Sequence, residues 1–531
     1  METTPSNSRW LILAVLCASV FVVVLDGTII NVTLPTLARE LSASTSQLQW
    51  IVDSYVLVFA GLLIAAGSIG DRFGRKGVMQ VGLVLFAVFS AFASWSDSAG
   101  ELIVWRALMG VGAALLFPAT LAILVNVFTA PKERAIAIAV WAATAGIAVA
   151  VGPVTGGLLL DHFWWGSVLM INVPIIAVTL LAVARFVPTS RDTAIARFDP
   201  IGTAASIAGI TVLVWAVIEG PVHGWTSPTS LLAFTLAATL LVGFVVWERR
   251  IDHPLLDVSV FSDLRFTAGS VAVTFAFFAL FGFIFVVTQY FQFVRDYSAL
   301  EAGLRTVPFA VFTASTAPLS AKLAERIGTK AVVTGGLLSM SGGFAIAATT
   351  GAIETPYAVI VLTMLFIGGG LGLVQAPATE AIMGSLPRAK AGVGSAVNDT
   401  ARELGGTLGV AIVGSVFSTV YASRLGEALI GSPVPADAVA LAEESVGAAN
   451  EVAAQAGATA GSQAGAFVSN AVDSAFVAGW RAGSWVSAAV VLLGALVAWR
   501  FLPARAAEVT TLSETGSPQP EPAQVSIAVG Q

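Results

Sequence analysis

The sequence predicts an all-α polytopic membrane protein, and two observations support this prediction. The 531 residues are 56% hydrophobic and only 11% charged, with a mean hydropathy of +0.87, whereas soluble proteins average about 25% charged residues. Apolar stretches of membrane-spanning length recur along the whole chain. They are continuous and lack the two-residue alternation of a membrane-spanning strand, so we expect helices throughout.

Fourteen stretches are expected to span the membrane. Their approximate ranges are 10–33, 46–70, 78–96, 100–120, 134–160, 166–187, 201–219, 229–248, 266–292, 302–322, 331–350, 356–380, 391–420 and 476–502. An even number of spans puts both termini on one side. When that side is taken as the cytoplasm, 19 of the 26 Lys and Arg residues fall inside and five fall outside, in agreement with the positive-inside rule.

An internal repeat divides these spans into two halves. Residues 67–76 align with residues 321–330, and residues 110–120 align with residues 369–379. The alignment predicts an N-terminal six-helix half over 1–190, two inserted helices over 191–260 and a C-terminal six-helix half over 261–502. Parallel halves around a site near the middle of the membrane are a common design of secondary transporters.

Two stretches are expected to lie outside the membrane. Residues 421–475 face outward and are rich in Ala, Gly and Ser. Helix propensity over 436–455 and 463–473 favours a short helical hairpin, and a flexible linker is the open alternative. The tail 503–531 contains Ser-Pro-Gln-Pro-Glu-Pro, a composition typical of a disordered cytoplasmic segment.

Two acidic residues lie inside the first two spans. Asp26 interrupts an otherwise apolar run, and Asp53 lies in the next span within Trp-Ile-Val-Asp-Ser-Tyr. A carboxylate inside a membrane helix costs about 2.5–3.5 kcal/mol even on lenient scales. Both residues fall roughly 10 Å from the outer helix ends, so we expect them to form a paired cation or proton site. The alternative is that each is a hydrated residue near a helix end.

Further membrane charges are candidates for proton coupling. Arg106 lies in the fourth span and is expected either to stabilise an ionised carboxylate or to extend toward the outer surface. In the span 391–420, Asp399 and Glu403 share a helix face, with Arg402 three residues from Asp399. Glu403 is the preferred proton carrier. Asp399 and Arg402 are as readily explained as a pair that neutralises itself.

Small residues and charges form two motifs. Candidate gate residues lie in two places, the loop between spans 2 and 3 and the fifth span. They are Gly67, Asp71, Arg72, Gly74, Arg75, Gly152, Pro153, Gly156 and Gly157. Glycines allow helices to approach closely, and proline permits a bend. Asp71 is expected to bridge to the positive end of a helix in the other half.

These motifs resemble those of the major facilitator superfamily. The runs 25–35 and 50–55 are similar to those of its fourteen-helix drug:proton antiporter branch, including QacA-like and EmrB-like multidrug exporters. The resemblance implies a major facilitator fold, alternating access, export driven by a proton gradient without another cofactor, and a monomer in the bacterial inner membrane. It departs in span 302–322, where QacA-like proteins can carry an acid and this chain has none between 302 and 321.

The expected substrates are lipophilic organic cations, which would compete with protons for Asp26, Asp53 and Glu403. Aromatic contacts are expected from Trp50, Tyr55, Tyr290 and Phe291. No nucleic-acid partner is expected. An exporter of an endogenous lipid, siderophore or metabolite is the main alternative. An importer is less favoured because the fifth-span motif looks like one associated with exporters that exchange their substrate against protons. An enzyme or channel is least favoured because no nucleophile–base, metal or filter motif appears.

Overall fold

The computed structural model describes residues 6–189, 199–252, 254, 256, 258–386, 391–432 and 434–504, and this part of the chain is helical without strands. The N-terminal half comprises α1 (Ser6–Glu40), α2 (Thr45–Phe73), α3 (Arg75–Ser94), α4 (Ala99–Val127), α5 (Pro131–His162), α6 (Ser167–Met170) and α7 (Asn172–Phe186). The inserted segment comprises α8 (Pro200–Ile218), α9 (Gly220–His223), α10 (Pro228–Glu248) and the short 3-10 helix η1 (Val258–Ser262).

The C-terminal half contains the remaining helices. They are α11 (Leu264–Gln289), its π-helical continuation η2 (Tyr290–Val294), α12 (Ala299–Ile327), α13 (Thr329–Thr350), α14 (Tyr357–Gly384), α15 (Ala391–Leu429), α16 (Ala436–Glu444), α17 (Val446–Ala460) and α18 (Ser462–Phe501). The predicted all-α membrane fold is confirmed.

Thirteen helical segments in the described ranges are long and apolar enough to cross a membrane. The one predicted span that is not among these thirteen, 302–322, forms helix α12, which packs against α5 and α14 but is less apolar than the others. The hydroxyl side chains of this helix form hydrogen bonds with backbone carbonyls. The Thr313 hydroxyl, for example, lies 3.0 Å from the carbonyls of Phe309 and Gly368. Such bonds allow hydroxyls inside a membrane bundle.

The two halves repeat the same close contacts. Gly74 and Gly328 both have positive φ angles, 105° and 92°, and each joins two consecutive helices at a sharp turn. In each half a glycine also allows close helix packing. A Cβ on Gly82 or on Gly336 would lie 2.8 Å from a carbonyl oxygen of the neighbouring helix. The sequence repeat is therefore also a repeat of backbone geometry.

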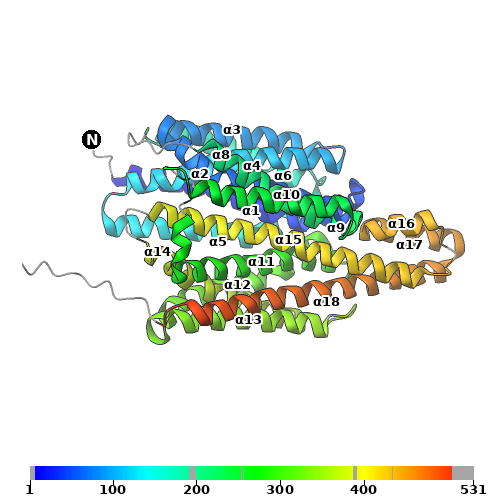
Figure 1. Ribbon diagram of the computed structural model, residues 1–531. Helices are drawn as coiled ribbons and strands as arrows, with labels where there is room; N and C mark the ends of the chain where they lie inside the picture. The colour runs from blue at the N-terminus through cyan, green and yellow to red at the C-terminus, as the bar shows by residue number, and fades with distance from the viewer. Residues whose placement is uncertain are drawn as a thin grey trace, which may run out of the picture.

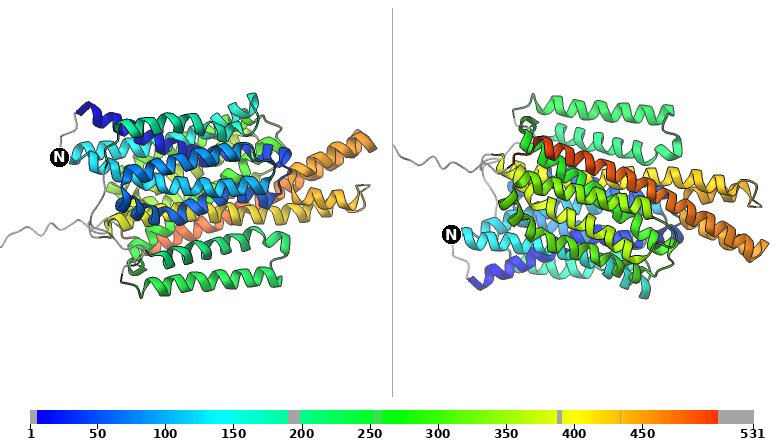
Figure 2. Two further views of the ribbon diagram at one scale, coloured as in Figure 1. Left: turned by 90° about the horizontal axis from the view of Figure 1, so that it is seen from above. Right: turned by 90° about the horizontal axis from the view of Figure 1, so that it is seen from below.

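The halves lie side by side with their helices roughly parallel (Figure 1). Figure 2 shows the inserted helices α8 and α10 at one side of the bundle. Helix α8 packs against α2 and α15, and α10 packs against α8. The inserted pair therefore contacts both halves through α8.

Residues 421–475 are largely helical in their described part, in line with the predicted helical hairpin and not with a flexible linker. Helix α15 continues to Leu429, and α18 begins at Ser462, so these long helices project beyond the bundle together with α16 and α17 (Figure 1). We call this end of the molecule the hairpin end. The hairpin also contacts the N-terminal half, because Ser445 Oγ donates to the carbonyl of Ala43 (3.1 Å) and Thr45 Oγ1 donates to that of Glu444 (3.1 Å).

Candidate functional site

A buried ion pair between Asp26 and Arg106 forms the centre of the N-terminal half. Helix α1 carries Asp26 and α4 carries Arg106, and neither side chain has any exposed surface. Arg106 Nε also donates to the carbonyl of Ile51 on α2 (3.1 Å). The arginine therefore turns inward and does not extend to the surface. A buried charge pair of this kind requires further hydrogen bonds to offset its desolvation.

Two further side chains complete this network. Asn172 Nδ2 donates to Asp26 Oδ1 (2.8 Å) and to Ser90 Oγ (3.1 Å). The Tyr55 ring lies 4.4 Å from the Arg106 guanidinium carbon, in cation–π geometry. The Tyr55 hydroxyl donates to the carbonyl of Val23 (3.2 Å). Helices α1, α2, α3, α4 and α7 thus all contribute to holding the Asp26 carboxylate.

Asp53 has a different environment. Its side chain is fully buried, and neither carboxylate oxygen has a hydrogen-bond partner. One turn away, Gln49 Nε2 donates to the carbonyls of Val410 (3.1 Å) and Ala411 (2.9 Å) on α15. Asp53 therefore lies on the part of α2 that packs against the C-terminal half. An unpaired carboxylate in such a place is expensive when ionised.

The structure does not bring Asp26 and Asp53 into one paired site. Ile51 and Tyr55 both contact the Arg106 network, and Asp53 is two residues from each of them. Residues two apart on a helix do not share a face. Asp53 is therefore turned away from Asp26, even though both belong to neighbouring segments of α1 and α2.

The acidic residues of α15 are partly buried. Asp399 accepts a hydrogen bond from Asn398 Nδ2 (3.4 Å), and no ion pair joins it to Arg402 among the described residues. The Arg402 guanidinium lies 5.4 Å from the centre of the Phe277 ring instead. Glu403, one turn beyond Asp399 on the same helix, is half-buried. The proton-coupling role of Asp399 and Glu403 remains a prediction.

Three of the predicted aromatic contacts are engaged in packing. Trp50 Nε1 donates to Glu219 Oε1 (3.3 Å), at the contact between α2 and the inserted segment. Tyr290 is fully buried, lies 4.3 Å from Trp480 ring to ring, and donates to the carbonyl of Ala352 (3.0 Å). Phe291 is fully buried beside Tyr297. Their role in substrate binding is untested, and in this arrangement they act as packing groups.

The loop motif separates α2 from α3. Gly74 supplies the positive φ at this turn, and Gly67 lies against Pro118 of α4. Arg75 Nη1 donates to the carbonyl of Ala122 (3.4 Å), while Arg72 is exposed beside Phe73. The Asp71 side chain lies outside the described residues, so its bridge to the other half stays a prediction.

The fifth-span motif lies between the two halves. Added Cβ atoms on Gly152 and Gly156 would collide with Thr28, Ile29 and Val32 of α1. An added Cβ on Gly157 would lie 2.6 Å from the carbonyl oxygen of Ala299 on α12. A Cβ added on Gly303 of α12 would likewise lie 2.3 Å from the carbonyl oxygen of Pro153. Helix α5 therefore connects α1 to the other half near the hairpin end.

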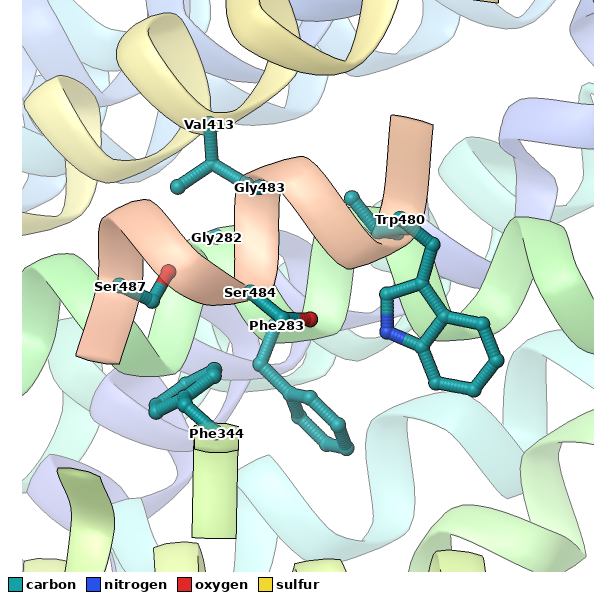
Figure 3. Close-up of a pocket in the computed structure, with 9 residues that line it drawn as sticks. Gly282, Phe283, Phe344, Val413, Trp480, Gly483, Ser484 and Ser487 are labelled. Atoms are coloured by element: carbon teal, nitrogen blue, oxygen red, sulfur yellow. The ribbon is translucent and has the colours of Figure 1, made fainter. Parts of the chain in front are cut away.

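Two cavities were not expected from the sequence. A void of about 10 Å³ lies inside the C-terminal half. Its lining includes Ser484 and Ser487 of α18 together with Phe283 and Phe344 (Figure 3). It has room for a single water molecule. A second cavity of about 460 Å³ opens at the hairpin end between α1, η2, α17 and α18. Its polar lining includes Arg39, Asp296 and Asp473.

Asn172 and Gln49 were missed in the sequence analysis. Asn172 lies in the apolar run Met-Ile-Asn-Val-Pro, and a polar residue in such a run is a detectable signal. Gln49 lies near the predicted start of a span, where a polar side chain is ordinary. Its contact with α15 follows only from the way the two halves pack.

Comparison with known proteins identifies the family to which this architecture belongs. The sequence matches the Major Facilitator Superfamily over residues 16–410. The multidrug efflux pump LfrA of Mycolicibacterium smegmatis is 36% identical over 459 residues, which cover 86% of this chain and 90% of LfrA. The multidrug resistance protein Stp of Mycobacterium tuberculosis is 32% identical, with 81% of this chain and 80% of Stp covered. The methyl viologen resistance protein SmvA of Salmonella typhimurium is 34% identical, with coverage of 84% and 89%.

Solved structures share the fold at low sequence identity. A bacterial homologue of the human lysosomal transporter Spinster, in an inward-facing and unoccupied conformation, has a TM-score of 0.63 at 17% identity and covers 93% of this chain and 98% of its own. The inward-open xylose transporter XylE from E. coli has a TM-score of 0.56 at 16% identity, with coverage of 93% and 96%. The family match over most of the chain and the relatives above 30% identity show that this chain belongs to the major facilitator superfamily.

Proposed function

We propose that this transporter exports lipophilic organic cations in exchange for protons. The three relatives named above are a multidrug efflux pump, a multidrug resistance protein and a methyl viologen resistance protein. Methyl viologen is itself an organic dication. The proposal places the protein in the bacterial inner membrane as a monomer, with both termini in the cytoplasm and the hairpin end outside, in keeping with the distribution of Lys and Arg.

The observation that carries the proposal is the Asp53 carboxylate, which is buried and has no partner. A buried carboxylate is stable either as the neutral acid or beside a cation. A proton and a cationic drug would therefore exclude one another at Asp53. Such competition is the minimum requirement for exchanging the two across a membrane.

Asp26 has a separate role in the proposed cycle. Arg106 and Asn172 both donate to its carboxylate, so a proton that binds there must displace one of these contacts. Helix α1 also contacts α11 and α12 of the other half. Protonation of Asp26 would therefore be coupled to the relative position of the halves. Glu403 and Asp399 are proposed as the second proton-carrying pair, and the motif residues of α5 and the α2–α3 loop as parts of the gate.

The test is ethidium transport in inside-out vesicles with an acidic lumen. Parent protein should concentrate ethidium in the lumen. Asp53→Asn should impair transport of ethidium much more than that of a neutral drug, while Asp26→Asn should abolish transport of both. Asp97→Asn, in an exposed loop of the hairpin end, is the matched control and should transport both.

Three results would contradict the proposal. Ethidium movement that is independent of the pH gradient would exclude proton exchange. Equal losses for charged and neutral drugs in Asp53→Asn would assign Asp53 to general coupling. Vesicles that move no drug but do move a lipid or siderophore would favour the alternative exporter on the same fold.

A further inference from the structure

Helix α1 contains a break in its own hydrogen bonding at Pro35. Proline has no backbone N–H, so the carbonyl of Asn31, four residues earlier, has no donor from its own helix. Proline rings also crowd this carbonyl and tend to bend the helix. A carbonyl buried in a membrane bundle costs several kcal/mol if it is left without a partner. The position of Pro35 therefore demands a donor from elsewhere.

The donors come from the other half of the protein. Thr288 Oγ1 of α11 lies 3.2 Å from the carbonyl oxygen of Asn31, and Gln292 Nε2 of η2 donates to that of Val32 (2.8 Å). Both donor side chains are buried. They are four residues apart and so lie on one face where α11 passes into its π-helical end. Two adjacent carbonyls of α1 are thus satisfied across the interface between the halves.

Where α5 packs against α1 near these carbonyls, the described residues supply no donor side chain. Gly152 and Gly156 of α5 pack there and contribute no side chain. The Asn31 amide bonds to the carbonyl of Gly27 (3.2 Å) and not to its own. Among the described residues, Thr288 is therefore the donor that reaches the carbonyl released by Pro35.

Thr288 also has a second acceptor. Its hydroxyl lies 3.0 Å from the carbonyl of Ile284 in its own helix. The hydroxyl has one proton, so the two carbonyls of Asn31 and Ile284 share it. If the halves separate at the hairpin end, the hydroxyl donates to Ile284 alone, and water can reach the Asn31 carbonyl. Neither group is then left unsatisfied. The contact is therefore reversible, and it favours the closed arrangement by about one hydrogen bond.

We propose that Thr288 and Gln292 are positioning residues that hold the Pro35 segment of α1, and with it Asp26, in the arrangement in which the two halves are in contact at this level of α1, here called the closed arrangement. Asp26 lies five residues before Asn31, a rise of about 7.5 Å along the helix. Separation of the halves would release the Pro35 segment and allow the Asp26 segment to move relative to Arg106. The inference rests on the proposed function only for its consequence in transport. The conformational effect stands by itself.

The experiment measures the distance between the halves at the hairpin end by spin-label spectroscopy. Labels are placed on Asp97→Cys and Glu354→Cys, which lie in exposed loops of different halves, in a Cys17→Ala background in lipid nanodiscs. No substrate or gradient is present, so the readout is independent of efflux. Thr288→Val and Gln292→Leu should each lower the ratio of closed to open populations by about two- to tenfold.

Three further variants make the result specific. Thr288→Ser retains the hydroxyl and should match the parent. Gln289→Leu removes an equally buried amide whose bond stays within α11 (2.8 Å to the carbonyl of Phe285), and it should not favour the open form. Pro35→Ala restores the N–H that the Asn31 carbonyl lacks. In that background Thr288→Val should change the ratio no further, because its acceptor is already satisfied.

The proposal is overturned if Thr288→Val and Gln292→Leu open the hairpin end no more than Gln289→Leu does. It is also overturned if Thr288→Val has the same effect with and without Pro35, since the double-mutant cycle would then show no coupling. A Thr288→Ser variant that opens like Thr288→Val would show that packing, and not the hydroxyl, is responsible. All variants are first compared for monodisperse folding, so that misfolding is not mistaken for opening.

Discussion

Arg106 and Asp26 form an ion pair that is completely enclosed by the N-terminal half. The pair joins α1 to α4, and the bond from Arg106 to the carbonyl of Ile51 adds α2. Because no water reaches either group, each charge depends on the other for its stability. This relationship makes the pair a structural link between three helices, and the function proposed above gives it a part in proton coupling.

Arg106→Ala should destabilise the protein strongly. Breaking a buried pair by removing one partner leaves an uncompensated charge and typically costs about 3–5 kcal/mol. We expect a lower melting temperature in detergent, measured by intrinsic tryptophan fluorescence. The control is Arg424→Ala, which removes an exposed partner of Glu427 and should have little effect, because surface pairs contribute little. Equal effects of both variants would show that burial does not govern the Arg106 pair.

Asn172→Ala should weaken proton coupling without removing a charge. The variant leaves Asp26 Oδ1 without the donor it now has at 2.8 Å, a loss of about 1–3 kcal/mol for a buried acceptor. We expect fewer protons released per ethidium added to solubilised protein. Thr179→Ala, on the same helix, removes a buried hydroxyl that bonds only to Ile175 of its own helix, and should release protons like the parent. A normal proton count in Asn172→Ala would show that this amide does not support coupling.

Gly157→Ala should disturb the contact between the halves. A methyl group at this position would lie 2.6 Å from the Ala299 carbonyl oxygen and 2.5 Å from Leu300 Cα, so α5 and α12 must move apart. We expect a larger hairpin-end distance and slower ethidium efflux. Gly146→Ala is the matched control, because nothing lies within 4 Å of the added methyl group on the same helix. Parental distance and efflux in Gly157→Ala would exclude this contact from the gate.

Much of the architecture follows from the sequence by itself. The length and apolarity of the runs determine which segments become helices, because a backbone in lipid must satisfy its own hydrogen bonds. The repeated glycine turn at Gly74 and Gly328 follows from the repeat in the sequence. The acids at positions 26 and 53 are recognisable because charge in a membrane helix is costly and therefore rare. The weakly apolar α12 was still identified as a helix.

Only the tertiary structure decided which of these groups meet. Asp26 pairs with Arg106 and Asn172, while Asp53 faces away from that network. The sequence predicts the same distance from the outer helix end for both acids and does not distinguish them. The physical reason is rotational. A helix that is apolar on all sides gives no signal of which face turns inward. The sequence therefore predicts how deep in the membrane a residue lies, but not the direction in which its side chain points. Trp50 and Tyr290 illustrate the same point, because the bonds of Trp50 to Glu219 and of Tyr290 to Ala352 are set by packing and cannot be read from the chain. The capping of the Asn31 carbonyl by Thr288 joins residues 257 positions apart, and only the packing of one half against the other brings them into contact.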